Sequence, residues 1–106
     1  CVPCKREIPH LMELKNEFSD QPVEFILIDV GEQREKVEPY ISKEKIDLHV
    51  LLDQYQVFSE KYGATSLPRL IVVSKNGVVR KYQKGFKDAD IFTTDMRKLI
   101  TELSEE

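Results

Sequence analysis

The sequence predicts an α/β domain with a central mixed sheet flanked by helices on both faces. Residues 23–30 (VEFILIDV) form a nearly continuous apolar run, typical of a strand buried on both faces of a mostly parallel sheet. The turn Lys75-Asn76-Gly77 lies between two further strand-like segments and predicts an antiparallel hairpin. Segments with a helical spacing of apolar residues occur before, between and after these strands, so helices can cover both sides of the sheet.

The first helix is predicted over residues 5–18, and a charged surface helix over residues 32–45 follows the strand at 23–30. Pro9 lies inside the first helix, where the loss of a backbone donor should kink it. Apolar residues near one face support each helix: Ile8, Leu11, Met12, Leu14 and Phe18 in the first, and Val37, Tyr40 and Ile41 in the second.

The middle of the chain predicts a short strand at residues 49–52 and a short helix after it. Asp53 can cap this helix, and Gly63 can end it in left-handed geometry. A loop over residues 64–67 then leads to Pro68. The apolar residues that we expect to pack the short helix are Val57, Phe58 and Tyr62.

The last part of the chain predicts the hairpin and a final helix. Residues 70–73 and 78–83 form the two strands, and Gly85-Phe86 ends the ladder. Asp88 is a good N-cap for the helix that follows. That helix has a core-facing stripe of apolar residues at intervals of three and four: Phe92, Met96, Leu99, Ile100 and Leu103.

Composition predicts one soluble globular domain over residues 1–106, with 41% hydrophobic and 33% charged residues. The net charge of −3, with basic residues spread among acidic ones, gives no support for a nucleic-acid partner. No apolar run is longer than that of residues 25–28, and such a run is far too short to cross a bilayer. We expect any targeting segment or membrane tether to lie upstream of these residues.

The motif Cys1-Val2-Pro3-Cys4 holds both cysteines of the chain and predicts redox chemistry. Free backbone N–H groups and the helix dipole at a helix start favour negative charge, so the leading thiol should ionise easily and act as a nucleophile. A disulfide at this spacing closes a very small loop and would stabilise the fold only slightly. Half of a metal site is the alternative, with His10 and His49 as the only further ligands of the Cys and His type.

The order of elements and the segment CVPCKREIPHL resemble the TlpA/ResA-like branch of the thioredoxin family. The residues that match that branch's pattern are Cys1, Pro3, Cys4, Glu7, Ile8 and Pro9. The resemblance extends through Asp29-Val30, Leu52-Asp53, Tyr62-Gly63, Leu67-Pro68 and Asn76-Gly77, and so covers essentially the whole chain.

The resemblance implies a thioredoxin-like fold, although the family's central strand before the first cysteine is absent from these residues. We therefore expect residues 1–106 to be a single thioredoxin-like domain that belongs to a longer chain. The strands that would flank the absent strand should lack their partner.

The resemblance also implies a thiol–disulfide oxidoreductase without a cofactor, acting as a reductase outside the bacterial cytoplasm, for example in cytochrome c maturation. Its partners would be a disulfide-containing protein substrate and an upstream dithiol donor. Cys1 would be the attacking thiolate, because the first cysteine of such a pair is the more exposed, and Cys4 would resolve the mixed disulfide.

Four further residues are candidates for the site. Glu7 either opposes ionisation of the thiols and relays a proton, or simply complements the helix dipole. Pro68 matches the family's cis-proline, which exposes the backbone of the residue before it, Leu67, to a substrate strand. Arg69 can add positive potential near Cys1 or attract an acidic substrate segment, and otherwise is an arginine at a strand end reaching solvent.

Two other functions fit the same sequence. One is a peroxiredoxin-like peroxidase whose peroxidatic cysteine precedes these residues. The other is a non-catalytic module that binds a metal or a protein through the same helix start.

Overall fold

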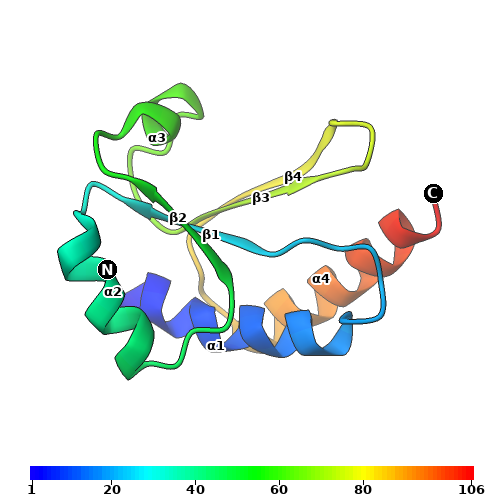
Figure 1. Ribbon diagram of the computed structural model, residues 1–106. Helices are drawn as coiled ribbons and strands as arrows, with labels where there is room; N and C mark the ends of the chain where they lie inside the picture. The colour runs from blue at the N-terminus through cyan, green and yellow to red at the C-terminus, as the bar shows by residue number, and fades with distance from the viewer. The chain divides into compact units, whose positions relative to one another are not determined.

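The computed structural model describes residues 1–106 and has the predicted order of helices and strands (Figure 1). The elements are α1 (Val2–Glu17), β1 (Ile26–Val30), α2 (Arg34–Lys43), β2 (His49–Asp53), α3 (Val57–Lys61), β3 (Arg69–Val73), β4 (Val79–Lys84) and α4 (Ala89–Ser104). They belong to two compact units, one of residues 1–23 with 66–106 and the other of residues 24–65. The first unit contains every residue of the predicted site.

Helix α1 begins at Val2, earlier than the predicted residue 5, so the cysteine motif forms its first turn. It continues through Pro9 and ends at Glu17. Leu11 and Leu14 are buried on its inner face, and Leu14 has no exposed surface.

Strands β3 and β4 form the predicted antiparallel hairpin. Arg69 lies opposite Lys84 and Ile71 opposite Tyr82, with an irregularity in the register after Val72. Gly77 has a φ of +81°, a left-handed conformation that glycine adopts without a steric penalty.

Helix α4 starts as predicted, because Asp88 Oδ1 accepts a hydrogen bond of 3.0 Å from the Ile91 N–H. Arg97 of α4 donates two hydrogen bonds, of 2.7 and 2.8 Å, to the carboxylate of Glu17 and so ties α4 to α1. The hydrophobic core of this unit contains Leu11, Leu14, Phe86, Phe92, Met96 and Ile100.

In the second unit, β1 and β2 form a parallel ladder in which Ile26 lies opposite His49 and Val30 opposite Asp53. Asp53 accepts hydrogen bonds from the backbone N–H groups of Phe58 (3.2 Å) and Ser59 (2.8 Å), and so caps α3 as predicted. Burial alone would raise the pKa of Asp53, but these hydrogen bonds outweigh burial and lower it.

Strand pairing is confined to the two ladders, one parallel and one antiparallel. Both strand directions of the predicted mixed sheet are therefore present.

Two expectations about packing are wrong. The strand predicted over residues 23–30 spans only Ile26–Val30. Ile26 is 50% exposed and not buried on both faces as predicted, because β1 pairs with β2 alone. Val57, Phe58 and Tyr62 are exposed, since the inner side of the short α3 is occupied by Ser59 at Asp53.

None of the helices is both long enough and apolar enough to span a lipid bilayer.

Candidate active site

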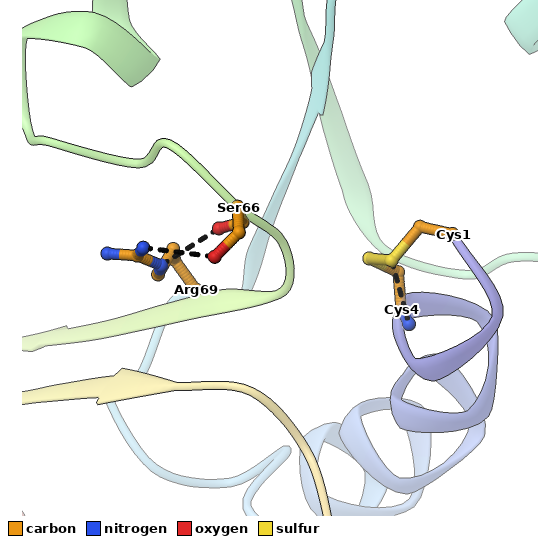
Figure 2. The surroundings of a disulfide bond; sticks show 4 residues. All are labelled: Cys1, Cys4, Ser66 and Arg69. Carbon is orange, nitrogen blue, oxygen red and sulfur yellow. Dashed lines mark hydrogen bonds between the residues drawn. A yellow bond between two sulfur atoms is a disulfide. The ribbon is translucent and has the colours of Figure 1, made fainter.

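Cys1 and Cys4 form a disulfide in the first turn of α1 (Figure 2). Their Cα atoms are 5.3 Å apart, and the backbone N–H of Cys4 donates a hydrogen bond of 3.3 Å to Cys1 Sγ. Cys1 is exposed and Cys4 is half-buried. An incoming nucleophile or disulfide therefore has readier access to the sulfur of Cys1.

The local sequence explains why the helix begins at this motif. Cys1 occupies the N-cap position, where a side chain accepts a hydrogen bond from a backbone N–H that has no partner within the helix. Pro3 lies in the first turn, where the proline's missing N–H costs no helical hydrogen bond. The N-cap sulfur thus faces the end of the helix that favours negative charge.

Glu7 follows Cys4 by about one helical turn and is buried, with only 5% of its surface exposed. It lies on the same inner stripe as Leu11 and Leu14. Burial raises the pKa of Glu7 to about 7, and its Oε2 atom accepts no hydrogen bond in the structure. A carboxyl group with this pKa can hold or release a proton at neutral pH.

The Leu67-Pro68 peptide bond is cis, as the resemblance implied. Pro68 is buried, and its carbonyl accepts a hydrogen bond of 2.9 Å from the Gly85 N–H. Leu67 is 40% exposed, and neither its N–H nor its C=O forms a hydrogen bond in the structure. The backbone of Leu67 can therefore pair with an extended segment.

Arg69 is held by neighbours in its own unit. Its Nε donates to the Ser66 carbonyl at 2.8 Å, its Nη2 to Ser66 Oγ at 3.2 Å, and its Nη1 to Tyr82 Oη at 3.0 Å. Figure 2 shows Ser66 and Arg69 in the surroundings of the disulfide, with the guanidinium group pointing away from the cysteines.

The predicted site residues therefore come from two places in one unit. Cys1, Cys4 and Glu7 lie on α1, and residues 67–69 lie at the start of β3. Ser66 and Tyr82, which fix Arg69, were missed by the sequence analysis. The hairpin register could have indicated Tyr82, because residues 69 and 82 are diagonal neighbours on one face of the ladder.

The two histidines considered as metal ligands have other contacts. The His10 ring stacks on Phe86 at a centroid distance of 5.7 Å in the first unit. In the second unit, His49 Nδ1 lies 3.4 Å from Glu24 Oε1.

Comparison with known proteins gives a consistent family. The family model described as Redoxin matches residues 1–100. A thiol-disulfide oxidoreductase ResA of Geobacillus thermodenitrificans is 32% identical over 85 residues, which are 80% of this chain and 49% of that protein. The chain spans about half the length of the curated relatives it matches.

Two solved structures show the same fold. A putative thiol:disulfide interchange protein DsbE from Chlorobium tepidum has a TM-score of 0.88 at 16% identity, covering 98% of this chain and 72% of that one. StoA from Bacillus subtilis has a TM-score of 0.74 at 22% identity, covering 89% and 72% of the two chains. The predicted thioredoxin-like fold and the likeness to ResA-type proteins are confirmed.

Proposed function

Because the chain belongs to the Redoxin family, we propose that it is a thiol–disulfide oxidoreductase that exchanges electrons with a partner protein through Cys1 and Cys4. The observation that carries this proposal is the Cys1–Cys4 disulfide at the start of α1, with one exposed and one half-buried sulfur. This arrangement suits a nucleophile and a resolving thiol.

The reaction transfers two electrons in two exchange steps. The Cys1 thiolate attacks one sulfur of the partner's disulfide, an S–S bond forms between enzyme and partner, and the partner's other sulfur leaves as a thiolate that takes up a proton. The Cys4 thiolate then attacks Cys1 Sγ and releases the second thiol of the partner. The partner is reduced to a dithiol and the enzyme is left as the Cys1–Cys4 disulfide.

Glu7 supplies a proton acceptor for the second step. Cys4 must lose its proton before it attacks, and Glu7 lies one turn further along the same helix with an Oε2 atom free of hydrogen bonds. A pKa of about 7 lets the carboxylate take that proton and return it to solvent at neutral pH.

The partner's extended segment pairs with the backbone of Leu67 beside the cis peptide bond to Pro68. Arg69 flanks this segment at the start of β3. The position of residues 67–69 in the same unit as the cysteines supports this assignment.

We further propose that the protein acts as a reductase outside the bacterial cytoplasm, with cytochrome c maturation as one such role. An upstream dithiol donor regenerates the reduced cysteines, and any membrane tether precedes these residues. The resemblance to the TlpA/ResA-like branch supports these assignments. Residues 1–106 act as one domain in this proposal.

A mixed disulfide between a cysteine-containing peptide and thionitrobenzoate tests the proposal. The reduced protein should release thionitrobenzoate and peptide thiol in equal amounts and end as the Cys1–Cys4 disulfide. Cys1→Ser should release neither. If Cys1→Ser released as much thionitrobenzoate and peptide thiol as the wild type, Cys1 would be excluded as the nucleophile. If the reduced protein did not react with the mixed disulfide but its two thiols bound a metal ion, the result would favour a binding module.

A further inference from the structure

We infer that Arg69 is a positioning residue, which acts through Ser66 to hold the Leu67 backbone in place for a substrate strand. The inference rests on the proposed function. In this role Arg69 does not contact the substrate through its charge. It forms a local scaffold with Ser66 and Tyr82 instead.

The hydrogen bonds around Leu67 support this role. The carbonyl before it, that of Ser66, accepts from Arg69 Nε at 2.8 Å, and the carbonyl after it, that of Pro68, accepts from the Gly85 N–H at 2.9 Å. Only the backbone groups of Leu67 itself are left unpaired between these two fixed points. A segment with both ends fixed loses less conformational entropy when a substrate pairs with it.

The guanidinium group is itself fixed. Tyr82 Oη accepts from Arg69 Nη1 at 3.0 Å, and Arg69 Cζ lies 5.8 Å from the centroid of the Tyr82 ring. Tyr82 lies opposite Ile71, so the β3–β4 register places it diagonally across from Arg69 on one face. The hairpin thus anchors the arginine that holds the loop.

The planar fork of arginine is what this arrangement requires. Nε and Nη2 bind two atoms of Ser66 while Nη1 binds Tyr82. A lysine keeps the positive charge but has a single nitrogen, so it cannot reproduce the three contacts together. Arg69→Lys therefore separates the effect of position from the effect of charge.

The experiment compares two mixed disulfides of thionitrobenzoate, one with an extended peptide and one with N-acetylcysteine. Both present the same leaving group to Cys1, but only the peptide has an extended backbone beyond its cysteine that can pair with the Leu67 backbone. The ratio of their second-order rate constants therefore measures docking. We expect Arg69→Lys to lower this ratio about tenfold, equivalent to the loss of one or two hydrogen bonds, and Tyr82→Phe to lower it less.

Arg80→Lys is the matched control. Arg80 lies on β4 of the same hairpin, and its guanidinium group donates hydrogen bonds to Glu106 and not to residues 66–69. It should leave the ratio unchanged. Thermal unfolding of each variant separates loss of docking from loss of fold, and Tyr82→Phe provides a second test if Arg69→Lys does not fold.

Three outcomes bear on the inference. If both Arg69→Lys and Tyr82→Phe leave the ratio at the wild-type value, the positioning role is overturned. If Arg69→Lys behaves as wild type but Arg69→Ala loses activity toward acidic peptides alone, Arg69 acts by charge. If the wild type reacts with neither probe, the proposed function itself fails.

Discussion

The backbone N–H of Cys4 donates a hydrogen bond to the Sγ atom of Cys1. The two redox residues are therefore also the donor and the acceptor of the N-cap hydrogen bond of α1. In the reduced protein the same N–H can stabilise a Cys1 thiolate. The position that starts the helix thus also favours the nucleophile.

Cys4→Ser should trap the reaction halfway. Without the resolving thiol, the first exchange with the peptide mixed disulfide releases thionitrobenzoate but leaves the peptide bound to Cys1. Intact-mass measurement should show a stable adduct of one peptide per protein for Cys4→Ser, and none for Cys1→Ser. A stable adduct on Cys1→Ser would reverse the roles of the two cysteines.

Glu7→Gln should remove part of the pH dependence of stability. Burial raises the pKa of Glu7 from 4.5 to about 7, so the folded state binds this proton more tightly than the unfolded state. The resulting stabilisation is complete below pH 4.5 and is lost as the pH rises through about 7. Urea unfolding at pH 5 and pH 8 should show a smaller loss of stability for Glu7→Gln than for the wild type. The exposed Glu102→Gln serves as control, and an equal change in both variants would contradict a special role for Glu7.

Asp29→Asn should remove a second part of this dependence at a lower pH. Burial first, and then the hydrogen bond and negative charge of Glu32, raise the pKa of Asp29 from 3.8 to about 6. Its stabilising proton is therefore bound below pH 3.8 and lost as the pH rises through about 6. Asp29→Asn should be more stable than the wild type at pH 7, measured by urea unfolding. If the difference in stability between Asp29→Asn and the wild type were the same at pH 4 and at pH 7, the prediction would be contradicted.

Leu14→Ala should destabilise the helix that carries the cysteines. Leu14 has no exposed surface, and truncating a leucine at such a position costs about 2–5 kcal/mol. Chemical unfolding of the oxidised protein measures the change. Leu103→Ala, at a half-buried position near the end of α4, should cost clearly less. Equal costs would mean that Leu14 is not central to packing.

The sequence predicts the helices and strands well where a local signal is strong. The Asn76-Gly77 turn defined the hairpin, and Asp88 defined the start of α4. Helix α1 starts earlier than its apolar pattern predicts, since a cysteine is not a usual N-cap residue. The burial of β1 was overestimated, because apolar periodicity reports the composition of a strand and not the number of its neighbours.

Some features of the candidate site could be predicted from the sequence and others could not. The sequence spacing of Glu7, Leu11 and Leu14 places all three on one face of α1, and so predicts that Glu7 is buried. A search for apolar residues alone passes over this position, because glutamate is not apolar. The contacts of Arg69 depend on the register of β3 against β4 and on the path of the loop at Ser66. Such contacts between distant positions require the folded structure.

A glutathione redox titration of the protein, read by alkylation and mass spectrometry of Cys1 and Cys4, tests the central claim most directly. We predict one cooperative two-electron transition, in which the Cys1–Cys4 disulfide closes within a single chain at a potential below that of glutathione. A pair that never closes, or that closes only between chains, would contradict the proposal that this dithiol is the redox centre.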